Sequence, residues 1–105
     1  MRILEEIKAK KEAFELLCEN HNVGKLYAFG SSTRDNFSEI DSDIDLLIEI
    51  NTEDPLERGE KLISIWNSFE KFFQRKVDLL TYKSIKNPIL KKNIDANKIL
   101  IYEAR

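Results

Sequence analysis

The chain has 105 residues, of which 34% are charged and 42% hydrophobic, and its formal net charge is -2 at pH 7. This length suits a single domain over residues 1–105, and the acidic balance argues against binding of long nucleic acid, which requires a positive excess. One cysteine and no apolar run of membrane-spanning length lead us to expect a cytoplasmic protein without membrane contact.

The first half of the chain carries one helical pattern and two strand patterns. Apolar residues from Ile3 to Leu17 recur at spacings of three, four and seven, which predicts a helix over residues 3–20 that ends before Gly24. Residues 25–29 are short, aromatic and apolar, as in a strand, and Gly30 interrupts them. After a polar stretch, residues 43–50 predict the clearest strand, because apolar residues occupy every second position from Ile44 to Ile50.

The second half begins with a capped helix and continues with shorter elements. Asp54 as N-cap and Pro55 at the first helical position predict a helix to about Gln74, with Leu62, Trp66, Phe69 and Phe73 as its apolar stripe. A strand over 77–81, a helical turn over 83–87, a helix over 88–97 and a strand over 99–102 follow. This order predicts an α/β or α+β fold, with helices packed on a small mixed β-sheet.

Three aspartates are candidate catalytic and metal-binding residues. Asp43 and Asp45 are two positions apart on a predicted strand, so their carboxylates project from the same face. Their mutual repulsion would be relieved by a bound cation, and Mg²⁺ prefers such oxygen ligands. Asp78 interrupts another apolar run, which is unfavourable unless it is exposed or paired. If the two strands are neighbours, the three carboxylates could hold two metal ions for displacement at phosphorus.

A candidate phosphate-binding turn follows the first strand. Glycine at position 30 lets the backbone approach a ligand closely. The amide and hydroxyl of Ser31, together with Ser32, could hold triphosphate oxygens, and Arg34 could add a fixed positive charge. Gly30 could also be a plain turn residue, and Arg34 could be a surface salt-bridge partner.

The aspartates could instead belong to a calcium loop or to a solvated strand end. A calcium loop that starts at Asp41 is excluded, because it needs glycine at its sixth position and glutamate at its twelfth, where this chain has Leu46 and Thr52. A solvated strand end would account for Asp43 and Asp45, but it would not explain Asp78 or the glycine turn.

The combined motifs resemble one enzyme family. The run Gly30-Ser31-Ser32-Thr33-Arg34, followed by Ser42-Asp43-Ile44-Asp45, resembles the glycine-serine and Asp-x-Asp signature of minimal nucleotidyltransferases, which belong to the DNA-polymerase-β-like superfamily. Residues 76–80 resemble the segment with the family's third carboxylate, and residues 87–102 resemble its closing helix and strand. The resemblance implies a polymerase-β palm-like nucleotidyltransferase fold, ATP as the nucleoside triphosphate substrate and two Mg²⁺ ions.

The same resemblance assigns roles to residues. Asp43, Asp45 and Asp78 would be catalytic and metal-binding, and Gly30, Ser31, Ser32 and Arg34 would bind the nucleotide. The family usually has ten residues between the Gly-Ser pair and the first aspartate, whereas residues 32–42 number eleven here. Asp41 therefore offers an alternative register. Asp43 and Asp45 are preferred because the apolar strand begins directly after them, and one extra loop residue is well tolerated.

The resemblance also implies a protein partner. Minimal nucleotidyltransferases are frequently antitoxins of HEPN-domain ribonuclease toxins and transfer AMP to a toxin tyrosine. We therefore expect AMP transfer to a hydroxyl of a HEPN-family protein. From the composition of its polar loop, Phe37 could be a docking aromatic, or it could fold back onto the core. Two alternatives stay open: a non-catalytic antitoxin that neutralises its partner by docking, and an enzyme that modifies itself or a small molecule. A homo-oligomer also stays open.

Overall fold

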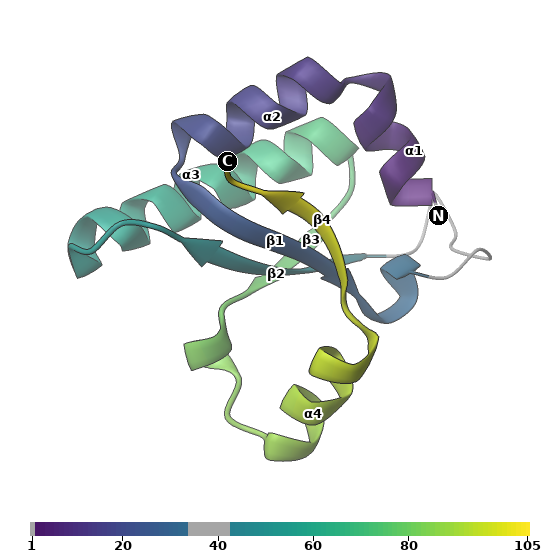
Figure 1. Ribbon diagram of the computed structural model, residues 1–105, viewed down its shortest axis with the longest axis vertical. Coiled ribbons are helices and arrows are strands. Elements are labelled where there is room, and N and C mark those ends of the chain that lie inside the picture. The colour runs from purple at the N-terminus through teal and green to yellow at the C-terminus, as the bar shows by residue number, and fades with distance from the viewer. Residues whose placement is uncertain (1, 34–42) are drawn as a thin grey trace.

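The computed structural model describes residues 2–33 and 43–105 (Figure 1). Arg34, Phe37 and Asp41 lie outside these residues, so what we expect of them stays a prediction. The elements are, in order, α1 (Arg2–Ala9), α2 (Lys11–Asn20), β1 (Val23–Phe29), the 3₁₀ turn η1 (Gly30–Thr33), β2 (Ile44–Ile50), α3 (Pro55–Phe73), β3 (Val77–Leu80), the 3₁₀ turn η2 (Tyr82–Ser84), α4 (Pro88–Asn97) and β4 (Ile99–Glu103).

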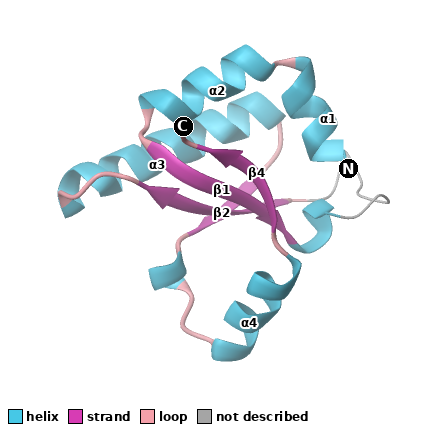
Figure 2. Ribbon diagram, in the orientation of Figure 1, coloured by secondary structure: helices cyan, strands magenta, loops and turns pink. Residues whose placement is uncertain are grey.

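The strands form one mixed sheet in the order β3-β2-β1-β4. Strand β1 is antiparallel to both β2 and β4, whereas β2 and β3 are parallel. A parallel pair requires a crossover connection, and α3 supplies it. The expected small mixed sheet with helices packed on it is therefore confirmed (Figure 2). In the described part of the chain, no helix is long and apolar enough to cross a membrane.

The sheet separates two apolar clusters. Helices α1, α2 and α3 cover one face, and α4 lies on the other (Figure 1). In β2, Ile44, Leu46 and Ile48 belong to the larger cluster under the three helices. Leu47 points to the opposite face, where it packs with Ile94 of α4. The predicted alternation of β2 is therefore confirmed, and it leaves the face of Leu47 to carry both α4 and the candidate site.

The caps of α3 and α4 set where these helices begin. The Asp54 carboxylate accepts a hydrogen bond from the Glu57 N–H at 2.9 Å, and Pro55 occupies the first turn, as the sequence predicts. The side chain of Asn87 accepts from the N–H groups of two residues in the first turn of α4. Such caps satisfy N–H groups that have no partner within the helix.

Two predicted elements differ from the structure at their boundaries. The helix expected over residues 3–20 is broken at Lys10, which has φ -132° and ψ 46°. Periodicity missed this break because Ile3 and Ile7 on one side, and Phe14 and Cys18 on the other, all face the same core. Strand β1 begins earlier than expected, at Val23, so Gly24 lies in the strand and the turn precedes it.

Trp66, which the sequence predicts in the apolar stripe of α3, lies outside the buried core. The residue is 36% exposed, and its indole N–H donates to the Val77 carbonyl at 2.6 Å. Ile65 is fully buried instead. Both residues are apolar and adjacent, so the helical spacing alone did not decide which one faces the sheet. The indole N–H needs a hydrogen-bond acceptor, and the edge strand β3 provides it.

Candidate active site

Two of the three predicted carboxylates lie opposite each other. Strands β2 and β3 pair so that Asp45 is the direct partner of Asp78. Both residues are partly buried, and strand alternation places them on the sheet face of Leu47 and Leu80, away from the larger core. The sequence predicted that these carboxylates meet if their strands are neighbours, and for Asp45 and Asp78 this condition is fulfilled.

The surroundings of the pair make Asp45 hard to ionise. Burial, the charges of Asp78 and Asp43, and a side-chain hydrogen bond with Asp78 together raise the pKa of Asp45 from 3.8 to about 6. Asp43 is exposed, one residue before β2. A carboxyl group next to other carboxylates holds its proton more tightly, because ionising it adds a like charge.

The donor set fits a hard divalent cation. Its atoms are carboxylate oxygens, which Mg²⁺ prefers, and a cation would relieve the repulsion that, after burial, raises the Asp45 pKa. Within residues 2–33 and 43–105, no three His, Cys, Asp or Glu side chains already enclose a metal position. The three-carboxylate site thus stays a prediction, supported by the Asp45–Asp78 pair with the Asp43 charge acting on it.

Gly30 approaches the Asp45 carboxylate so closely that no other residue fits without displacement. Its φ of +62° lies in the left-handed region, and a Cβ atom there would come within 2.7 Å of the Asp45 Oδ2 atom. Its neighbour Phe29 is the strand partner of Asp45. Glycine is therefore favoured at position 30, because any side chain there would be strained and would displace the Asp45 carboxylate.

The remaining residues of the glycine turn have different surroundings. Ser32 is fully buried, and its hydroxyl accepts a hydrogen bond from the Asp45 N–H at 2.8 Å. This oxygen ties η1 to β2, and the contact of Ser32 with triphosphate oxygens stays a prediction. The hydroxyl of Thr33 donates to the Gly30 carbonyl at 2.9 Å. Ser31 lies in η1, and its role stays a prediction.

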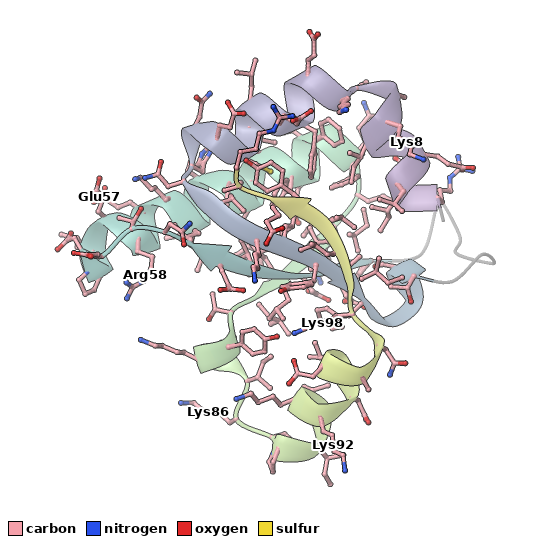
Figure 3. The ribbon with its side chains drawn as sticks, in the orientation of Figure 1. Lys8, Glu57, Arg58, Lys86, Lys92 and Lys98 are labelled. Atoms are coloured by element: carbon pink, nitrogen blue, oxygen red, sulfur yellow. The ribbon has the colours of Figure 1, made fainter. Side chains whose placement is uncertain are left out.

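Sequence reasoning missed a cluster that joins α4 to the sheet. The Lys98 ammonium donates to the Tyr82 hydroxyl and to the Asp95 carboxylate. It also lies 4.6 Å from the centre of the Tyr27 ring, between the sheet and α4 (Figure 3). These hydrogen bonds raise the pKa of Lys98. The cluster comes from separate segments, so no local sequence pattern indicates it.

Sequence reasoning also missed a pocket of about 330 Å³ between the end of β1 and α4. Gly30 and Thr33 border it on one side, and Asn93 and Asn97 of α4 border it on the other. The i, i+4 spacing of the two asparagines was the one available signal, since it places both side chains on the same helix face.

The raised pKa of Asp45 predicts a pH dependence of stability in metal-free buffer. The folded state binds this proton more tightly than the unfolded state. The stabilisation is therefore complete below pH 3.8 and is lost as the pH rises through about 6. With solvent screening at a partly exposed site, the loss should be about 1–2 kcal/mol.

Urea unfolding between pH 4 and pH 7 measures this effect. Other carboxyl groups titrate in the same range, so the relevant quantity is the difference between the wild type and Asp45→Asn. As the pH rises, the free energy of unfolding of the wild type should fall relative to that of Asp45→Asn. Parallel pH profiles for the two proteins would contradict the pKa assignment.

Comparisons with known proteins concern the family and the fold. The family model described as "Polymerase beta, Nucleotidyltransferase" matches residues 11–105. A Methanocaldococcus jannaschii protein named "Putative protein adenylyltransferase" is 39% identical over 103 residues, which are 96% of this chain and all of that protein.

Solved structures share the fold. A structure described as a "putative minimal nucleotidyltransferase" superposes with a TM-score of 0.63 at 26% identity, covering 91% of this chain and 93% of the other. A chain from the complex of tri-AMPylated Shewanella oneidensis HEPN toxin with MNT antitoxin has a TM-score of 0.51 at 20% identity, covering 99% and 74% of the two chains. At that identity, the second match supports the fold alone.

Proposed function

Because this chain belongs to the polymerase beta nucleotidyltransferase family, we propose that this nucleotidyltransferase moves AMP from ATP to a hydroxyl on a protein partner. We propose a HEPN-family toxin as that partner, with the chain as its cytoplasmic antitoxin. The observation that carries the proposal is the direct pairing of Asp45 with Asp78, with Gly30 closely packed against the Asp45 carboxylate.

The residues divide the chemistry between them. A partner hydroxyl oxygen forms a bond to the α-phosphorus, the bond from that phosphorus to the bridging oxygen breaks, and pyrophosphate leaves. Asp78 accepts the hydroxyl proton as general base. Asp43, Asp45 and Asp78 would hold Mg²⁺, which when bound neutralises phosphate charge and lowers the pKa of the attacking hydroxyl.

The phosphate end of ATP is assigned to the glycine turn. Gly30 leaves room for phosphate oxygens beside the carboxylates, and Ser31 with Arg34 steadies them. Ser32 has a different task in this proposal: its hydrogen bond to the Asp45 N–H at 2.8 Å holds the turn against β2. Ser32 is thus a positioning residue that fixes the distance between the turn and the carboxylates.

A protein acceptor is supported by likeness to other proteins. The relative at 39% identity carries the name "Putative protein adenylyltransferase", and the fold is shared with a chain from a complex that contains an AMPylated HEPN toxin. Two rivals lead to different results. An antitoxin that acts by docking would bind the toxin without labelling it, and an enzyme for small molecules would label neither protein.

Transfer of radiolabel from α-³²P-ATP tests the proposal. The chain is incubated with Mg²⁺ and a HEPN-family protein from the same genome, and the labelled residue is identified by mass spectrometry. We expect AMP on a tyrosine of the partner. Label on this chain alone would show that the enzyme modifies itself and not the partner. A stable complex without label would favour the antitoxin that acts by docking. Absence of both label and complex would overturn the proposed partner.

A further inference from the structure

We propose that the pocket between β1 and α4 holds the nucleobase of the nucleoside triphosphate, with adenine as the preferred base. This inference rests on the proposed function and adds the part of the site that selects the base. The pocket has a volume of about 330 Å³, which lies within the range of small-molecule sites, roughly 300–1,000 Å³.

The pocket walls have the chemistry of a site for an uncharged ring. Phe29, Leu90 and Ile94 supply apolar surface, and Asn93 and Asn97 supply neutral amides. None of the described residues that line it is charged. A triphosphate needs cations or free N–H groups around it, whereas a heterocyclic base needs apolar faces and a few hydrogen-bonding groups at its edge.

Adenine suits the amides because of its hydrogen-bonding edge. A side-chain amide can donate and accept at once, and this matches the N6 donor and N7 acceptor of adenine. The Asn97 side-chain amide donates to the Asn93 backbone carbonyl at 2.9 Å, which fixes its orientation at the pocket wall. Lys92 of the same helix points away from the sheet on the outer side of α4 (Figure 3), so it adds no charge to the pocket.

Gly30 connects the pocket to the carboxylates. This residue borders the pocket and also lies against the Asp45 carboxylate. One nucleotide can therefore reach both places, with its phosphates at the glycine turn and its base against α4. The pocket wall is held in place by Ile94, which is 3% exposed and packs with Phe29 and Leu47. The base would thus meet a preformed surface.

Parallel titrations with ATP and with tripolyphosphate separate the base from the phosphates. Two variants change the pocket: Asn93→Leu removes an amide, and Leu90→Trp fills the space from a position that is 44% exposed. Asn67→Leu, at an exposed asparagine of α3, is the matched control. Calorimetry with Mg²⁺ gives the affinities, and thermal melting verifies that each variant folds.

We expect both pocket variants to lose roughly tenfold or more in ATP affinity, because a base-reading amide or its space is removed. Their tripolyphosphate affinity should stay within about twofold of the wild type, since the phosphate contacts are unchanged. Asn93→Leu should also lower the preference for ATP over GTP. Asn67→Leu should match the wild type in every titration.

The outcomes distinguish this inference from the proposed function. Unchanged ATP affinity in folded Asn93→Leu and Leu90→Trp would overturn the base pocket and leave the transferase intact. An equal loss for ATP and tripolyphosphate would also overturn it, because the pocket would then serve the phosphates. If the pocket variants lose ATP affinity as expected but the wild type transfers no AMP, only the proposed function is refuted. A wild type that binds neither ligand would overturn both.

Discussion

Replacing Asp45 by asparagine is expected to abolish AMP transfer while the fold survives. The substitution keeps the size of the side chain but removes the carboxylate that pairs with Asp78 across β2 and β3. A ligand carboxylate at such a site contributes several kcal/mol of charge stabilisation in the transition state, so the rate should fall by about 10³-fold or more. The α-³²P-ATP assay measures this rate, and circular dichroism verifies the fold.

The same variant should be more stable than the wild type in the absence of metal. Burial and the neighbouring carboxylates raise the Asp45 pKa to about 6, so near neutral pH an ionised Asp45 is held in an unfavourable place that asparagine avoids. Glu49→Gln is the matched control, since Glu49 is an exposed carboxylate of the same strand. Wild-type transfer by a folded Asp45→Asn protein, or equal loss in Glu49→Gln, would remove Asp45 from the catalytic site.

Replacing Gly30 by valine is expected to weaken nucleotide binding and to destabilise the fold. The backbone φ of +62° is strained for a β-branched residue, and the new Cβ atom would lie within 2.7 Å of the Asp45 Oδ2 atom. Strain of this kind costs about 1–3 kcal/mol. The side chain would also occupy space assigned to phosphate, so ATP affinity should fall roughly tenfold or more, which corresponds to about 1.4 kcal/mol.

Gly59→Val separates the site from a general effect of removing glycine. Gly59 lies within α3, and a Cβ atom there would meet no other heavy atom of the described residues within 4 Å. Valine at position 59 should preserve or slightly increase stability, because glycine is a poor helix former, and ATP affinity should not change. Calorimetric titration at a temperature where both variants are folded decides the matter. Unchanged ATP affinity in Gly30→Val would show that the phosphates lie elsewhere.

The sequence predicted most of the elements because their signals are local. The alternation of apolar residues identified β2, and Asp54 followed by Pro55 identified the start of α3. The helix that Pro88 opens was predicted over residues 88–97, which are the bounds of α4. The helix break at Lys10 was missed, and the helical spacing did not decide which of the neighbours Ile65 and Trp66 is buried.

The candidate site was predictable only in part, because its residues come from distant segments. Two aspartates on one strand can be read from spacing, but the pairing of Asp45 with Asp78 depends on the parallel register of β2 and β3. The role of Ser32 could not be read at all, since the sequence does not tell a buried hydroxyl from one that faces a ligand. The base pocket was missed for the same reason, as it forms only where α4 meets the end of β1.

By itself, the sequence determined the residue types, the order of the helices and strands, and the motifs that resemble a nucleotidyltransferase. The tertiary structure decided which of these residues meet. Strand order and register brought Asp45 and Asp78 together, raised the Asp45 pKa through burial and like charge, and placed Gly30 against the carboxylate. The physical reason is range: backbone preferences and side-chain periodicity act over a few residues, whereas burial, charge coupling and steric exclusion depend on atoms far apart in the chain.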